Sequence, residues 1–116
     1  MKLYGIPNCD TVARARKYLD ARQIHYDFHD VRADGLDPDV VAAAYAALGA
    51  STFNARSPSW RSLTDDQKSA LKDGRDFSAA VQTPTVLKRP LVFAGDTITN
   101  GFSEDAWNSL FTPNDA

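Results

Sequence analysis

The chain has 116 residues, of which 43% are apolar and 24% are charged, and its formal net charge at pH 7 is −2. This length and composition are those of an ordinary soluble protein with one folded domain, residues 1–116. No apolar run approaches the roughly 20 residues that span a bilayer, and the N-terminus lacks the apolar segment of a signal peptide. With a single cysteine and no secretion signal, we expect a cytoplasmic protein that does not associate with membranes.

The acidic balance, with an isoelectric point near 5.5, argues against a protein that binds nucleic acid directly. The first predicted helix nevertheless carries a local group of basic residues. They are Arg14, Arg16, Lys17 and Arg22. We expect them to form a solvent-exposed helix face, because surface helices usually carry their charged residues on the side away from the core.

The beginning of the chain centres on Cys9. Residues 1–6 form an apolar run that predicts a strand, Pro7 and Asn8 interrupt it, and a helical spacing of apolar residues follows over residues 9–21. Cys9 is therefore expected where a strand ends and a helix begins. Unpaired backbone amides and the positive end of the helix dipole stabilise a thiolate at such a position.

The cysteine count limits what Cys9 can do. As the only cysteine, it excludes an intramolecular disulfide and a thiolate-rich metal site. A lone cysteine in a small domain is often a buried apolar residue without a chemical role. The polar neighbours Asn8, Asp10 and Thr11 suit an exposed helix start better than a core, so we favour a reactive Cys9 over an inert one.

Residues 24–29 alternate between apolar and polar side chains, which predicts a half-buried strand. Together with the first strand and helix, this strand completes a β-α-β unit with parallel strands and a right-handed crossover. His25 and His29 fall on the polar side of the strand. We expect them to face solvent rather than bind a metal, because no third ligand lies at a usable spacing.

Residues 37–82 are predicted to be helical, with no strand of their own. Asp37 is placed to cap a first helix, which Gly49 ends. Residues 64–67 have the sequence of a capping box, which starts a second helix. Asp76 is expected to cap a third, short helix.

The last third of the chain predicts a β-hairpin and a helix. Residues 91–94 are a buried strand, Gly95 lies in the turn, and residues 97–99 form the antiparallel partner. Ser103 is expected to cap the final helix, and residues 112–116 to be a disordered tail. The apolar residues of this helix that are expected to face the core are Ala106, Trp107, Leu110 and Phe111.

This order of elements predicts an α/β fold with a mixed four-stranded sheet and helices on both faces. The plan is that of the thioredoxin-like fold. The helical region at residues 37–82 is then an insertion between the two halves of that fold.

Two arginines are candidates to bind a thiolate or an oxyanion, because a guanidinium is permanently charged and binds two oxygens at once. Arg56 lies in an irregular loop, and Arg89 lies just before the hairpin. The alternative is that each is a surface arginine in a weak ion pair. Pro90 follows Arg89, and a cis bond there could shape a thiol site, although most X–Pro bonds are trans.

Five blocks of sequence resemble the arsenate-reductase-like (ArsC/Spx) family of the thioredoxin superfamily, and most closely its small YffB proteins. The blocks are residues 3–11, 34–36, 53–63, 88–91 and 101–103. The resemblance implies a thioredoxin-like fold with Cys9 as the nucleophile. It also implies that Asn8, Arg56, Arg89 and Pro90 line a site for an oxyanion or a thiol substrate, with a cis bond before Pro90.

The resemblance leaves three functions open. The first is a glutathione-dependent thiol reductase, in which glutathione or another small thiol is a co-substrate and no metal or other cofactor takes part. The second is an arsenate reductase coupled to glutathione and glutaredoxin. The third is a non-catalytic regulator of the Spx type that binds RNA polymerase. We expect the chain to be a monomer in each case, since no long apolar surface stripe remains once the core is assigned.

Two departures from the family pattern bear on these alternatives. Arsenate reductases of this type carry a third arginine after the hairpin, where this chain has Gly101 or Phe102. Without that arginine, a bound tetrahedral oxyanion would have one fewer guanidinium partner. Spx-type regulators often carry a Cys-x-x-Cys pair, whereas this chain has Val12 at the second position, so an intramolecular disulfide switch is excluded.

Overall fold

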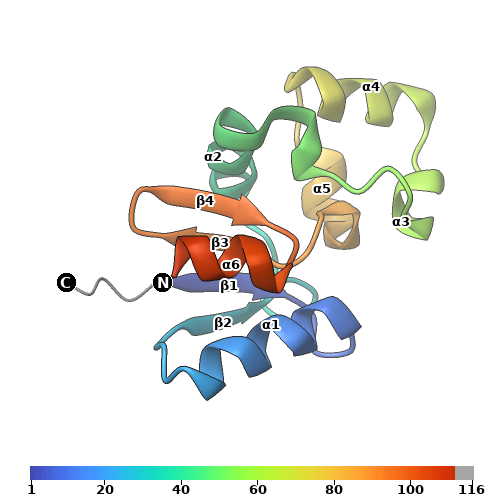
Figure 1. Cartoon of the computed structure of the whole chain (residues 1–116). Helices are drawn as coiled ribbons and strands as arrows, with labels where there is room; N and C mark the ends of the chain where they lie inside the picture. The colour runs from blue at the N-terminus through green and yellow to red at the C-terminus, as the bar shows by residue number, and fades with distance from the viewer. Residues whose placement is uncertain (112–116) are drawn as a thin grey trace.

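The computed structural model describes residues 1–111 and contains a four-stranded mixed sheet covered by helices on both faces (Figure 1). The strands are β1 (Lys2–Gly5), β2 (Asp27–Asp30), β3 (Leu91–Ala94) and β4 (Thr97–Asn100), in the spatial order β2-β1-β3-β4. β1 is parallel to β2, and both β1–β3 and β3–β4 are antiparallel. The predicted α/β class and mixed sheet are confirmed, while the tail expected at residues 112–116 lies outside the described residues.

The helices divide between the two faces of this sheet. On one face lie α1 (Asp10–Ala21) and α6 (Glu104–Leu110). The remaining helices belong to the segment between β2 and β3, which packs on the other face (Figure 1). They are α2 (Pro38–Leu48), η1 (Gly49–Thr52), α3 (Pro58–Arg61), α4 (Asp65–Asp73), α5 (Ser78–Gln82) and η2 (Pro84–Val86). None of the helices in the described part of the chain has the length and apolar character needed to cross a membrane.

Two apolar clusters, one on each face, hold these layers together. Successive residues of a strand point to opposite faces. Leu3 and Val92 therefore enter the cluster under α1 and α6, whereas Tyr4 and Leu91 enter the cluster under the inserted helices. The helical residues that are fully buried against the sheet include Val12, Leu19, Val41, Leu71 and Val86. β1 is consequently buried on both of its faces and paired along both of its edges.

The starts of α2, α4 and α6 follow the local sequence as predicted, whereas the N-cap residue of α5 is Phe77 rather than Asp76. Asp37 accepts a hydrogen bond from the Asp39 amide at 2.8 Å, and Ser103 accepts one from the Ala106 amide at 3.1 Å. The capping box at the start of α4 is complete. Asp76 accepts hydrogen bonds from the hydroxyl and the amide of Ser78, which hold the pKa of its carboxyl below the ordinary value of 3.8.

Two expectations about strand and core residues are wrong. β2 begins at Asp27 rather than at residue 24, because Gln23 adopts a left-handed conformation (φ 57°) and the Ile24 amide bonds back to the end of α1. Ala106 and Leu110 of α6 are exposed instead of facing the core, and 37% of the Leu110 side chain is accessible. This short helix is anchored to the sheet through Trp107, which is almost completely buried.

Gly74 provides a test of the packing of α4 on α2. It ends α4 with φ +72°, and a Cβ there would lie 2.5 Å from the Cε1 atom of Tyr45. We expect Gly74→Ala to lower the free energy of unfolding by about 2–4 kcal/mol, the sum of left-handed strain and overpacking. Urea denaturation measures this change.

The matched control is Gly35→Ala, because Gly35 also has a positive φ (+81°) but a Cβ there would meet no atom within 4 Å. This variant should lose only about 1–2 kcal/mol, from strain alone. Equal losses in the two variants would contradict the proposed clash with Tyr45.

Candidate active site

Cys9 lies at the junction of β1 and α1, where the sequence predicted it. It is the N-cap residue of α1 and has an extended backbone (φ −106°, ψ 124°). Its carbonyl accepts the first helical hydrogen bond, from the Ala13 amide at 2.9 Å, but its side chain caps nothing. The sulfur therefore lies at the positive end of the helix dipole, beside amides that have no partner within the helix.

The surroundings of Cys9 differ from those of a core cysteine. The residue is partly buried and touches both apolar clusters, at the point where they meet at one end of the sheet. Its neighbours Asn8 and Asp10 are exposed, as expected from their polarity. Cys9 is thus fixed by packing on one side and open to solvent on the other.

The pairing of β1 with β3 brings Arg89 and Pro90 to the same end of the sheet. Tyr4 pairs with Leu91, so the continued register sets Pro90 opposite Gly5. Arg89 then falls opposite the loop that leads to Cys9. Pro90 is buried, the bond that precedes it is cis as the family resemblance implied, and its carbonyl accepts a hydrogen bond from the Gly101 amide at 3.0 Å.

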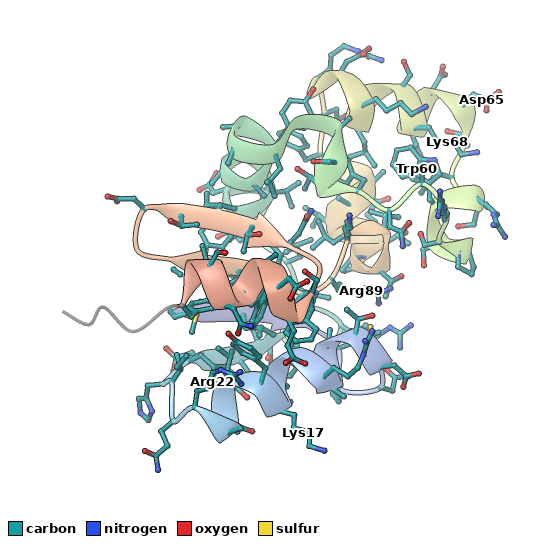
Figure 2. The ribbon with its side chains drawn as sticks, in the orientation of Figure 1. Lys17, Arg22, Trp60, Asp65, Lys68 and Arg89 are labelled. Atoms are coloured by element: carbon teal, nitrogen blue, oxygen red, sulfur yellow. The ribbon has the colours of Figure 1, made fainter. Side chains whose placement is uncertain are left out.

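Arg89 has a donor without a partner. The side chain lies at the end of the sheet where α1 begins (Figure 2). Its Nε atom is buried and makes no hydrogen bond to any residue within the described range 1–111. A guanidinium has five N–H donors, and buried donors are nearly always paired in folded proteins. An anionic group bound beside Arg89 would satisfy this donor.

Arg56 comes from the helical segment but lies next to the chain that leads to Arg89. An isolated antiparallel bridge joins Phe53 to Leu87. Two flanking hydrogen bonds extend the bridge, one from the Asn54 amide to the Val86 carbonyl at 2.8 Å and one from the Lys88 amide to the Thr52 carbonyl at 2.9 Å. The loop that carries Arg56 is therefore held against the segment immediately before Arg89.

The Arg56 loop is shaped by Asn54. The side chain of Asn54 accepts a hydrogen bond from the Arg56 amide at 3.0 Å, and its carbonyl accepts one from the hydroxyl of Ser57 at 2.9 Å. Arg56 itself is exposed and forms no salt bridge within residues 1–111. No hydrogen bond joins Arg56 or Arg89 to the Cys9 sulfur in this part of the chain.

The two histidines have different surroundings. Within residues 1–111, no group of three or more His, Cys, Asp or Glu side chains could hold a metal ion. His25 is exposed as expected. His29 is not simply solvent-facing, because its Nε2 atom hydrogen bonds to the Gly35 carbonyl at 2.7 Å and its ring packs on Tyr4.

Comparison with known proteins identifies the family. The model of the ArsC family matches residues 4–110. The chain belongs to the ArsC family. An uncharacterized protein of Haemophilus influenzae is 36% identical over 110 residues, which cover 94% of this chain and 96% of that protein.

Solved structures of ArsC-related proteins share this fold. The structure of a protein named YFFB has a TM-score of 0.85 and 33% identity, and the match covers 93% of this chain and 96% of that one. The solution structure of an arsenate reductase (ArsC) related protein from Brucella melitensis has a TM-score of 0.67 and 27% identity, covering 95% and 92% of the two chains. The thioredoxin-like plan predicted from the sequence is confirmed by these matches.

Lys88 is a further basic residue in this part of the fold. The residues that line a cavity of about 360 Å³ beside β4 include Lys88, Asn100 and Ser103. The Cε atom of Lys88 is 3.4 Å from the position of a Cβ on Gly101. A cation therefore lies against the position where arsenate reductases of this family are expected to have their third arginine.

The contact of Gly5 with Val12 sets how closely β1 approaches α1. A Cβ on Gly5 would lie 2.8 Å from one methyl carbon of Val12 and 3.0 Å from the other. We expect Gly5→Ala to lower the free energy of unfolding by about 1–3 kcal/mol through overpacking. Adding Val12→Ala removes the clashing methyl groups, so the double variant should lose less than the sum of the single losses.

A double-mutant cycle from urea denaturation measures this coupling. The control cycle combines Gly5→Ala with Val41→Ala, since Val41 belongs to the cluster on the other face of the sheet. Losses in the control cycle should be additive. Additive losses in the Gly5–Val12 cycle as well would mean that this contact does not set the spacing.

Proposed function

We propose that the chain is a glutathione-dependent thiol reductase of the ArsC family, with Cys9 as its nucleophile. The observation that carries the proposal is the position of a partly buried, uncapped Cys9 at the same end of the sheet as Arg89, whose Nε donor has no partner within residues 1–111. A thiol at the same end of the sheet as a guanidinium with an unpaired donor suits a substrate that carries both sulfur and negative charge.

The proposed reaction has two exchange steps. The thiolate of Cys9 attacks a disulfide, forms a mixed disulfide with one of its sulfurs, and releases the other as a thiolate. Because the chain has no second cysteine, an external thiol must complete the cycle. Glutathione attacks the sulfur bound to Cys9, takes it into a new mixed disulfide and regenerates the Cys9 thiolate. A second glutathione then exchanges with that mixed disulfide in solution, which releases the remaining substrate thiol and forms oxidised glutathione. Two glutathione thiols thus supply the two electrons that reduce one substrate disulfide.

The other site residues would bind and orient the thiol. Glutathione carries two carboxylates, and guanidinium groups bind carboxylates through paired hydrogen bonds. We assign one carboxylate to Arg89 and the other to the basic pair of Arg56 and Lys88. Pro90 and Asn8 would form the walls next to the sulfur.

Arsenate reduction is the second candidate. It is favoured by Arg89, because a guanidinium with an unpaired donor also suits a tetrahedral oxyanion. The relative from Brucella melitensis is described as related to arsenate reductase. Against it stands the absence of an arginine at positions 101 and 102, where Gly101 or Phe102 occupies the expected place of a third arginine and Lys88 would have to substitute for it. Turnover of arsenate with glutathione and glutaredoxin distinguishes this candidate from the first.

The role of Cys9 is tested by replacing it with serine. We expect the wild-type protein to form an adduct with oxidised glutathione, detected by intact-mass spectrometry, and excess reduced glutathione to remove it. Cys9→Ser should form no adduct and catalyse no thiol exchange, because a hydroxyl cannot form a disulfide. Full exchange activity in a folded Cys9→Ser protein would overturn the mechanism.

The role of Arg89 is tested by Arg89→Lys, which keeps the charge but loses the paired hydrogen bonds. We expect the KM for glutathione to rise about tenfold, as for the loss of one charge-assisted hydrogen bond. The control is Arg75→Lys, at an exposed arginine whose partner is Asp73 on the helical segment. A normal KM in Arg89→Lys, or an equal rise in the control, would argue against an anion site at Arg89.

A further inference from the structure

A hollow of about 580 Å³ lies between α1 and the start of α6. We call it the α1–α6 groove. Its residues are Arg14, Lys17, Tyr18, Ala21, Arg22, Phe102, Ser103 and Glu104. Four of these residues belong to α1 and Arg22 is its C-cap residue; their spacing of three or four positions places them on one flank of the helix.

The groove is basic in an acidic protein. Arg14, Lys17 and Arg22 are exposed, and Glu104 is the one carboxylate among the lining residues. None of the three cations forms a salt bridge within residues 1–111. The salt bridge found in this range joins Arg75 to Asp73, outside the groove. Three uncompensated cations in one hollow contrast with the net charge of −2 of the chain.

Aromatic contacts hold part of this basic wall in place. The guanidinium carbon of Arg22 lies 3.5 Å from the ring centre of Tyr18, and its Nη1 atom donates to the Tyr18 carbonyl at 3.3 Å. Tyr18 is itself buried and donates its hydroxyl to Asn108 at 2.7 Å. Figure 2 shows Lys17 on α1 and Arg22 at the C-terminal end of this helix. Because these contacts order the Arg22 side chain before a ligand binds, less conformational entropy is lost on binding.

Arg16 does not belong to this wall, although the sequence grouped it with the other three basic residues. Its guanidinium lies 4.0 Å from the ring centre of Phe28, and its Nε atom donates to the Tyr26 hydroxyl at 3.1 Å. The expected exposure is confirmed for Arg14, Lys17 and Arg22, but it is wrong for Arg16. Arg16 packs towards β2, whereas the other three line the groove.

We propose that the α1–α6 groove binds an extended acidic segment of a partner protein. From Arg14 to Arg22 the helix rises about 12 Å. An extended chain covers this length in about four residues. A short segment with two or three carboxylates could therefore reach all three cations. Charge complementarity of this kind raises the rate and the specificity of association.

A polypeptide fits the groove better than a nucleic acid does. Bases of single strands stack on exposed aromatic rings. Of the two aromatic residues in the groove, Tyr18 is buried with its hydroxyl bonded, and Phe102 is half-buried with its ring packed against Tyr18 and Trp107. A phosphate backbone is negative at every position, and it would bring a charge against Glu104. A peptide can place a neutral or basic residue there.

The groove begins close to the proposed reaction site, because Arg14 is one turn beyond the first residues of α1. Binding at the groove does not rest on the reactivity of Cys9. It can therefore be measured on the Cys9→Ser protein, so that failure of the thiol chemistry and failure of the docking proposal are distinguished.

The test measures the fluorescence anisotropy of a labelled peptide, four glutamates flanked by glycines, titrated with the full chain at low ionic strength. Arg14→Glu combined with Lys17→Glu should weaken binding by about tenfold or more, a change of about 1.4 kcal/mol. The control combines Arg32→Glu with Arg61→Glu, two exposed arginines outside the groove, and changes the net charge equally. It should bind within about twofold of the parent protein.

Circular dichroism spectra check that both double variants are folded. Equal weakening in the two variants would overturn the proposal, because binding would then depend on net charge alone. The proposal would also be overturned if the acidic peptide did not bind at low salt. It would be overturned as well if a single-stranded oligonucleotide of equal charge bound more tightly than the peptide and if the groove variant, Arg14→Glu with Lys17→Glu, abolished that binding. A tetralysine peptide that bound as well as the acidic one would contradict it too.

Discussion

The burial of β1 between two apolar layers is the constraint on which the rest of the structure depends. Leu3 and Tyr4 point into different clusters, and both edges of the strand are paired. A strand held on four sides has little freedom to shift, since a slip of one residue would exchange its two faces. The end of β1 is therefore a fixed point, and both Cys9 and the Arg89–Pro90 segment are placed relative to it.

At this end of β1, the candidate site combines the sulfur of Cys9 with positively charged side chains. Three parts of the chain meet there: the start of α1, the segment before β3, and the loop from the helical insertion that bridges to that segment. Each contributes a different chemistry, namely the thiol of Cys9, the unpaired donor of Arg89 and the exposed cation of Arg56. The pairing of β1 with β3 and the bridge from Phe53 to Leu87 account for why residues so distant in sequence lie at one end of the sheet.

Much of the fold follows from local sequence because its signals depend on neighbouring residues. The caps at Asp37, Thr64 and Ser103 each require one side chain and an amide two or three residues later, so sequence reasoning places those helix starts correctly. The buried hairpin strand and the position of Cys9 are predictable for the same reason.

The errors concern residues whose environment is set at long range. The exposure of Leu110 depends on how a short helix lies on the sheet. The position of Arg16 depends on aromatic rings of the next strand, which a helical wheel does not contain. Lys88 lies against Gly101 only because β3 and β4 pair, and this contact has no signature in either segment. The register of β1 with β3 likewise could not be derived before the sheet order was known.

The uncapped start of α1 has a consequence for how stability and chemistry are balanced in this fold. α2, α3, α4 and α6 each begin with a hydroxyl or carboxylate side chain that bonds to a backbone amide, whereas Cys9 occupies the same place without doing so. Serine is among the best residues at such a position, where it contributes about 0.5–2 kcal/mol. A chain selected for stability alone would carry serine at position 9. Under the proposed function, the nucleophile at position 9 is kept at a cost in helix stability, as in many functional sites.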